Sequence, residues 1–194
     1  EAVLSGGFDG VMLSNGPGDP ADNVEIITEV RKLYESELPL FAVCLGHQLI
    51  GAALGARVKK ASAPEIGIAP IKRVAKHDFF SMWSKELNVL QWHGDCISLP
   101  DSAELLARSS DTRVQAFRFG SALGMQFHLE VCGSLLDEWL DEPSMVKDLK
   151  AAGGSKSQLR EQFAQYDQLL QPLAEQVFSG FAARCNSYAQ TLNK

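Results

Sequence analysis

The sequence predicts an α/β fold, with a mostly parallel sheet lying between two layers of helices. Three observations predict it. An apolar run over residues 39–43 stops at Cys44 and is followed by a helical pattern, which indicates a buried strand, a tight turn and a helix. A second apolar strand ends in a turn-forming loop at residues 15–20. The last third of the chain carries a helical stripe of apolar residues, as expected for helices that cover a sheet.

The composition suits one folded domain and excludes several functions. The chain has 194 residues, of which 45% are hydrophobic, enough for a sizeable core. The net charge of -6 comes without a basic cluster, which argues against nucleic-acid binding. The apolar stretches are only strand-length, so no membrane span is predicted. We therefore expect small molecules or proteins as partners.

The cysteines indicate a reducing compartment. Cys44, Cys96, Cys132 and Cys185 lie far apart and form neither a CxxC pair nor a disulfide-rich pattern. We therefore predict a cytoplasmic location. The four histidines do not sit at metal-ligand spacing with these cysteines, so no metal site is predicted.

The segment before Cys44 predicts one strand and one helix. Residues 10–14 form a short apolar strand, and residues 24–34 place apolar side chains on one helical face. Asp22 or Asn23 is the expected helix cap. Pro39 then begins the strand that ends at Cys44.

After Gly55 the pattern changes to short strands punctuated by glycine, proline and aspartate. We interpret these strands as a mixed or antiparallel extension of the parallel sheet, with residues 76–86 as a short helix or loop packed on it. The predicted strands cover residues 57–60, 66–74, 88–92, 104–109, 114–119 and 122–127.

The final segment, residues 132–194, predicts helices. Pro143 suits a first helical turn, and Gly153 begins a glycine pair that ends that helix. Apolar residues from 159 to 181 then step by four and three along one face, which favours packing on the domain's own sheet over a partner helix. Pro172 predicts a break or a kink within this helix. We divide the chain into a core, 1–131, and a helical extension, 132–194, packed on the same domain.

The turn around Cys44 has the features of a nucleophile elbow. Ala42 and Gly46 are small enough for a sharp turn, and the backbone of the next residue, Leu45, can donate to an oxyanion. A cysteine at a helix start is also placed where the helix dipole favours the thiolate. The alternative is a buried structural cysteine, which is common.

A stretch much later in the chain supplies a second chemical signal. His128 and Glu130 alternate after an apolar strand, and a period of two points them the same way. A carboxylate beside a histidine fixes the ring, as in Ser/His/Asp sites. His47 is closer to Cys44 in sequence, but it lies just inside the helix and is interpreted as structural.

Three segments, in order, resemble the signatures of class I glutamine amidotransferases: Asn15–Pro20, Cys44–Gln48 and His128–Glu130. The resemblance runs from about Gly7 to Val131. It is closest to free-standing members similar to the glutaminase domain of GMP synthetase, on the strength of residues 65–70 and 92–95.

Two positions depart from the family pattern. Ala42 stands where glycine is usual, which is tolerated if the backbone there is not at positive φ, and Leu129 stands where many relatives carry proline. The family also usually has one more strand and helix before the nucleophile, so we expect an incomplete amino terminus.

The resemblance implies a flavodoxin-like sheet and assigns roles to named residues. It makes Cys44, His128 and Glu130 catalytic, and makes Gly16 an oxyanion donor beside Leu45. It places Gln48, His93, Gly94 and Asp95 at the glutamine-binding wall. The alternatives are a solvent-facing Gln48 and a turn with a solvated His93. The implied chemistry requires no metal or organic cofactor.

Three functions remain open at this point. The first is a glutamine amidotransferase that hydrolyses glutamine and supplies ammonia to a synthetase on another chain. The second is a stand-alone γ-glutamyl peptidase or hydrolase that uses the same triad. The third is a non-catalytic binding or regulatory protein, against which an intact Cys44, His128 and Glu130 argue.

Overall fold

The computed structural model describes residues 2–16 and 18–192. Pro17, which belongs to the predicted loop at residues 15–20, lies outside the described residues. So do residue 1 of the predicted core, 1–131, and residues 193–194 of the predicted helical extension, 132–194. In chain order the elements, with 3-10 helices labelled η, are α1 (Ala2–Ser5), β1 (Val11–Leu13), η1 (Pro20–Asp22), α2 (Val24–Glu35), β2 (Leu40–Val43), α3 (Leu45–Ala53), β3 (Val58–Arg73), η2 (Asp78–Phe80), β4 (Glu86–Ile97), β5 (Glu104–Arg108), β6 (Ala116–Phe119), β7 (Ala122–Met125), α4 (Gly133–Asp141), α5 (Pro143–Ala151) and α6 (Lys156–Leu192).

Within the described residues, the strands form a seven-stranded sheet in the order β1-β2-β7-β6-β5-β3-β4. Strand β2 lies between two parallel neighbours, with Leu40 opposite Val11 of β1 and Ala122 of β7. All four residues of β2 are buried, which explains its uninterrupted apolar sequence. The strand that delivers Cys44 is therefore held firmly on both sides.

The prediction of a mostly parallel sheet needs correction. Only the pairings of β1 with β2 and of β2 with β7 are parallel; the four pairings among β7, β6, β5, β3 and β4 are antiparallel. The reason is connectivity, because strands joined by short turns fold back as hairpins, whereas parallel neighbours need a crossover. The mixed extension expected after Gly55 is the part of the prediction that describes this region correctly.

Strand β4 curls back toward the end of β7. A long hairpin pairs β3 with β4, and the two strand runs predicted for residues 57–60 and 66–74 are one strand with an irregularity between Lys60 and Glu65. An isolated bridge then joins Leu90 of β4 to His128, just beyond β7. This curl brings the carboxyl half of β4 to the edge of the sheet where β2 ends.

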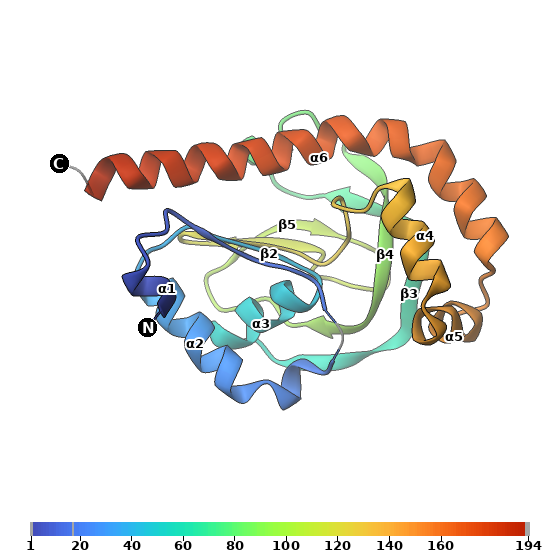
Figure 1. Ribbon diagram of the computed structural model, residues 1–194, viewed down its shortest axis with the longest axis horizontal. Helices are drawn as coiled ribbons and strands as arrows, with labels where there is room; N and C mark the ends of the chain where they lie inside the picture. The colour runs from blue at the N-terminus through green and yellow to red at the C-terminus, as the bar shows by residue number, and fades with distance from the viewer. Residues whose placement is uncertain (1, 17, 193–194) are drawn as a thin grey trace.

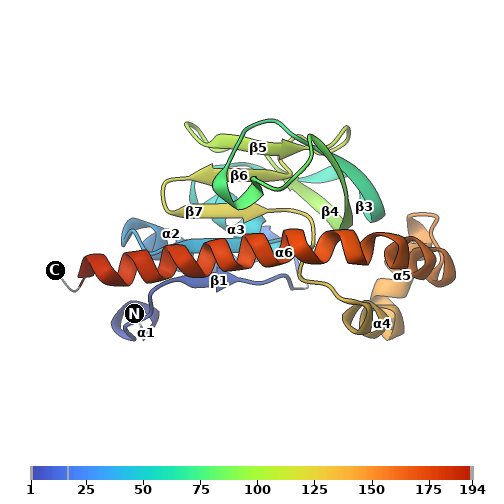
Figure 2. The same ribbon diagram turned by 90° about the horizontal axis from the view of Figure 1, so that it is seen from above.

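Helices cover both faces of the sheet, which confirms the three-layer α/β architecture (Figure 2). On one face, Val30 of α2 and Ile50 of α3 join a core with Leu40 and Phe117. On the other face, α6 packs across the strands through residues such as Val177. Asn23 is the N-cap of α2, but its side-chain amide donates to the Asp19 carbonyl oxygen and makes no cap bond.

Helix α6 runs through Pro172 without ending, so the predicted break does not occur. Leu170 and Leu173, on either side of the proline, and Val177 are buried in the same core as Phe41. This packing holds the helix on the sheet despite the lost backbone hydrogen bond. The ribbon curves along its length in Figure 1.

Helices α4 and α5 pack beside β4 rather than on the centre of the sheet. Leu136, Leu140 and Leu149 share a core with Leu90 of β4 and Phe163 of α6. The two helices therefore stand at the end of the sheet where β2 and β4 meet. Among the described helices, none is long and apolar enough to cross a lipid bilayer.

Candidate active site

Cys44 occupies a strained turn between β2 and α3. Its backbone has φ 52° and ψ -108°, a conformation that residues with a side chain rarely adopt. The strain is held from both sides, since Cys44 N donates to the Met125 carbonyl oxygen at 2.8 Å and Gln48 N donates to the Cys44 carbonyl oxygen at 3.1 Å. Strain of this kind at a cysteine is the signature of a nucleophile elbow.

The residues flanking the turn explain its sequence. A Cβ atom on Gly46 would clash with the Leu13 carbonyl oxygen, so only glycine lets α3 start so close to β1. Ala42 is a regular residue of β2 and does not have a positive φ, as required for alanine to replace the usual glycine.

His128 and Glu130 lie together, as their alternation predicts. The Nδ1 atom of His128 lies 2.6 Å from Oε1 of Glu130, and the histidine is only 2% exposed. His128 N donates to the Leu90 carbonyl oxygen at 2.9 Å, which fixes the segment after β7 against β4. The Glu130 carboxylate therefore ensures that Nδ1 of His128 carries a proton.

The surroundings of the His128 ring favour its protonated, positively charged form next to Cys44. Burial alone would lower its pKa, but the interactions with Cys44 and then with Glu130 outweigh burial and raise the pKa to about 10. Nε2 of His128 is buried and makes no hydrogen bond of conventional geometry to a described residue. Cys44 is nevertheless close enough to stabilise the protonated ring and so to raise its pKa. The Cys44 thiol itself donates over 3.7 Å to the Trp92 carbonyl oxygen of β4.

The two residues predicted as oxyanion donors are neighbours. A Cβ atom on Gly16 would lie 3.6 Å from Cδ2 of Leu45, and both residues line the same cleft as Cys44. Leu45 is the first residue of α3, where backbone N–H groups have no partner within the helix. The loop that contains Gly16 and the start of α3 therefore lie next to each other at the cleft.

Gln48 is buried along the wall of the cleft and does not face solvent. Its Nε2 donates to the Asp95 carbonyl oxygen at 3.2 Å and to Oε1 of Gln126 at 3.1 Å. Gly94 and Asp95 line the same wall. The Asp95 carboxylate pairs with Lys60 at 2.9 Å, and Lys60 also reaches Asp19 in the loop that follows β1.

His93 is not a solvated residue of a turn, since it is only 5% exposed. Its Nε2 lies 3.2 Å from Oε2 of Glu65, the residue opposite it on β3, and 3.1 Å from Oε1 of Gln91. Its Nδ1 lies 3.0 Å from the Asp95 carbonyl oxygen. Both ring nitrogens are thus engaged by the protein, and the ring braces the wall of the cleft.

His47 is fully buried in α3, as expected for a structural residue. Burial lowers the pKa of His47 to about 3, so the ring is neutral at physiological pH. Its ring packs edge-on against Phe117 with centroids 5.2 Å apart.

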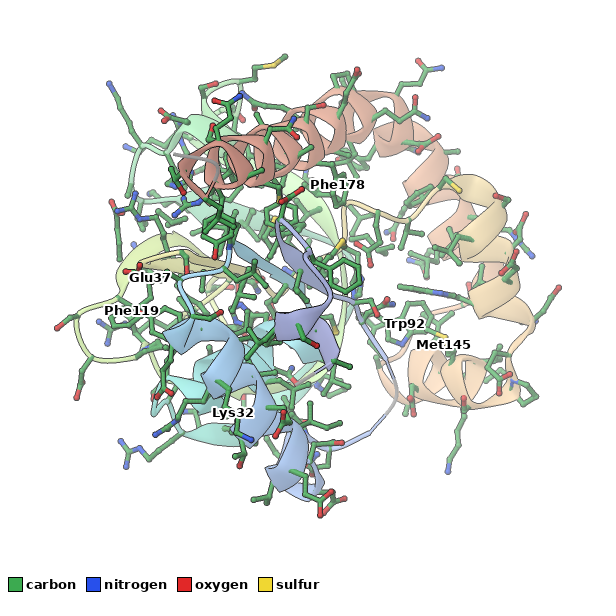
Figure 3. The ribbon with its side chains drawn as sticks, turned by 60° about the vertical axis from the view of Figure 1, so that its left-hand side comes forward. Lys32, Glu37, Trp92, Phe119, Met145 and Phe178 are labelled. Atoms are coloured by element: carbon green, nitrogen blue, oxygen red, sulfur yellow. The ribbon has the colours of Figure 1, made fainter. Side chains whose placement is uncertain are left out.

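Sequence reasoning missed the contribution of α4 and α5. The cleft has a volume of about 750 Å³, and its far wall includes Trp139 of α4 and Met145 of α5. Figure 3 labels Met145 and Trp92, which line the cleft from α5 and β4. The indole of Trp139 packs edge-on against both His128, at 5.0 Å, and Trp92, at 5.5 Å. The α4 sequence shows an amphipathic helix but not which element it covers.

The chain matches a known protein family and is similar in sequence to known proteins. Residues 1–142 match the family Glutamine amidotransferase class-I. A glutamine-hydrolyzing GMP synthase subunit of Saccharolobus solfataricus is 37% identical over 129 residues, which are 64% of this chain and 68% of that protein. The carbamoyl phosphate synthase small chain of Escherichia coli (strain K12) is 46% identical over 78 residues, which are 40% of this chain and 20% of that protein.

A solved structure shares the fold. A glutamine amidotransferase from Thermotoga maritima superimposes with a TM-score of 0.80 at 24% identity, covering 88% of this chain and 77% of that one. At this identity the likeness concerns the architecture alone. The resemblance drawn from the three sequence motifs is confirmed by the family match and by the relative from Saccharolobus solfataricus. The chain belongs to the class I glutamine amidotransferase family.

Proposed function

We propose that this protein hydrolyses the γ-amide of glutamine through a Cys44 thioester and releases ammonia. The observation that carries the proposal is the strained Cys44 elbow beside a histidine that is hydrogen-bonded to Glu130 at 2.6 Å. A nucleophile, a base and a group that orients the base are the parts that covalent acyl transfer requires.

The reaction starts with attack of the Cys44 thiolate on the amide carbon of glutamine, while His128 holds the thiol proton. The resulting oxyanion accepts hydrogen bonds from the backbone N–H groups of Leu45 and Gly16. The C–N bond then breaks as His128 returns the proton to the leaving nitrogen. Water attacks the thioester, and glutamate and free Cys44 are released.

The wall of the cleft holds the amino-acid end of glutamine in this proposal. Gln48, Gly94 and Asp95 line it, and their contacts with one another support a fixed shape. His93 contributes by bracing this wall through Glu65. A fixed wall matters because a small displacement of the amide from Cys44 costs a large factor in rate.

The ammonia is proposed to serve a synthetase on another chain. Two relatives are named as part of GMP synthase and as the small chain of carbamoyl phosphate synthase, and this supports a partner of that kind. The four cysteines are free thiols, which supports a reducing location such as the cytoplasm.

The test is glutaminase activity combined with labelling by a diazo-ketone analogue of glutamine. Cys44→Ala should abolish glutamine hydrolysis and labelling, whereas Cys96→Ala, Cys132→Ala and Cys185→Ala should retain both. Mass spectrometry should find the label on Cys44 alone. Hydrolysis that survives Cys44→Ala, or a label on another cysteine, would reject the proposal.

A further inference from the structure

The cleft is larger than free glutamine requires. A volume of about 750 Å³ falls in the range of pockets that hold drug-sized ligands, roughly 300–1,000 Å³. One end contains Cys44, Leu45 and Gly16, where the reacting carbonyl belongs in the proposed function. The other end is formed by α4 and α5, and ammonia, the leaving group of glutamine hydrolysis, is too small to fill it.

The unused end lies on the side of the leaving group. In the proposed mechanism His128 protonates the departing nitrogen, so that nitrogen must face the histidine. Trp139 packs directly against His128, and the cleft continues from Trp139 to Met145. Glu130 engages Nδ1 of His128, so Nε2, which lacks a conventional hydrogen bond among the described residues, is the ring nitrogen that would donate to the leaving nitrogen. A substituent on the nitrogen would extend toward α5.

The chemistry of this end favours a chain with a positive charge. Trp139 and Met145 offer apolar and aromatic surface, whereas Glu142 and Asp148 add carboxylates at the rim. Neither carboxylate forms an ion pair within the described part of the chain, and none of the residues lining the cleft is a lysine or arginine. The Asp95 carboxylate differs, because Lys60 already compensates its charge.

We propose that Trp139, Glu142, Met145 and Asp148 form a leaving-group subsite for γ-glutamyl amides whose amine carries a short cationic chain. The inference rests on the proposed function and specifies its substrate class. Cys44 forms the thioester as the bond from the γ-carbonyl carbon to the substituted nitrogen breaks. His128 gives its proton to that nitrogen, and water hydrolyses the thioester. The products are glutamate and the free diamine.

The test compares two amides of equal length, γ-glutamyl-butylamide and γ-glutamyl-(3-aminopropyl)amide, with glutamine measured alongside. The wild-type protein should prefer the aminopropyl amide by about fivefold in kcat/KM, as expected for two exposed carboxylates that each contribute modestly. The preference should shrink at high salt, because screening weakens exposed charge pairs.

Variants then assign the preference to the subsite. Asp148→Asn and Glu142→Gln should each reduce the ratio of the two amides, and the double variant should bring it close to one. Glu138→Gln is the matched control, because Glu138 is an exposed carboxylate of α4 that does not line the cleft, so this variant should keep the wild-type ratio.

Each alternative outcome is decisive. Hydrolysis of glutamine without hydrolysis of either amide would reject the subsite and leave the proposed function intact. An equal rate for the two amides, or a ratio that does not change in the double variant, would reject the role of the carboxylates and with it the inference. If neither glutamine nor the amides are hydrolysed, the proposed function and the inference both fail.

Discussion

The indole of Trp139 meets the imidazole of His128 edge-on, with ring centroids 5.0 Å apart and ring planes at 85°. The same indole contacts Trp92, whose carbonyl oxygen accepts the hydrogen bond from the Cys44 thiol. One side chain of α4 therefore touches the elements that hold both members of the proposed reacting pair. We assign Trp139 as a positioning residue.

Removal of this contact should affect turnover more than substrate binding. Edge-to-face aromatic pairs contribute about 0.5–1.5 kcal/mol, so Trp139→Ala should lower kcat for glutamine by roughly two- to tenfold. The KM for glutamine should change less, and Trp139→Phe should restore most of the loss. Steady-state kinetics across pH would reveal a shifted alkaline limb for Trp139→Ala, which a purely structural role would not produce.

A second prediction concerns the charge on His128. The ring should stay protonated through neutral pH and lose its proton as the pH rises through about 10. Turnover should fall over the same alkaline range, because the acid that protonates the leaving nitrogen is lost. Cys44→Ala removes the largest interaction that raises the pKa, so the His128 pKa should drop in this variant. Imidazole NMR titration measures it, with Cys96→Ala as control; identical pKa values in wild type and Cys44→Ala would contradict the coupling.

Local sequence patterns predicted the parts of the site that depend on neighbouring residues. The elbow follows from an apolar strand that runs into Cys44 and Gly46, and the pairing of His128 with Glu130 follows from a period of two. Both features arise within a few residues of chain, where spacing fixes which side chains meet.

The parts that were missed depend on contacts between distant segments. Glu65 meets His93 only because β3 and β4 pair in one register, which no single strand pattern specifies. Trp139 meets His128 because β4 curls and α4 packs on Leu90. The share of parallel strand pairs was overestimated for the same reason, because strand pairing depends on contacts between segments that are far apart in the sequence.

The pair formed by the buried His93 and the partly buried Glu65 gives a third prediction, on stability. Burial would raise the pKa of Glu65, but the hydrogen bond to His93 and those to neighbouring hydroxyl groups outweigh it and hold the pKa below 4.5. A carboxylate whose pKa is depressed on folding stabilises the folded state above its unfolded pKa, and this contribution is lost as the pH falls through the folded value.

Glu65→Gln should therefore reduce the free energy of unfolding at pH 7, by on the order of 1–3 kcal/mol. The difference from wild type should remain constant down to about pH 5 and then shrink toward pH 3. Urea denaturation at several pH values checks this. Glu104→Gln serves as control, because Glu104 is a partly exposed partner of Arg118 at 3.9 Å and should show only a small difference. A Glu65→Gln difference that does not vary with pH would contradict the ionic role.

The last prediction is that the strain at Cys44 opposes stability. A residue with a side chain held at φ 52° and ψ -108° costs on the order of 1–3 kcal/mol, and glycine relieves that cost. Glycine also raises the entropy of the unfolded chain, which destabilises by about 0.4–1 kcal/mol. Relief of strain is the larger of the two effects, so glycine should stabilise the fold relative to alanine. The free energy of unfolding of Cys44→Gly should be roughly 0.5–2 kcal/mol higher than that of Cys44→Ala.

Ala42→Gly provides the matched control two residues earlier, in β2. Ala42 is fully buried and lacks a positive φ, so glycine relieves no strain there and removes a packed methyl group. This variant should therefore lower the free energy of unfolding by about 1 kcal/mol relative to wild type. We expect glycine to change the free energy of unfolding in opposite directions at positions 42 and 44 relative to alanine, as measured by chemical denaturation. If glycine destabilises position 44 relative to alanine as well, the elbow stores no strain, and the geometry of Cys44 must be explained by its hydrogen bonds alone.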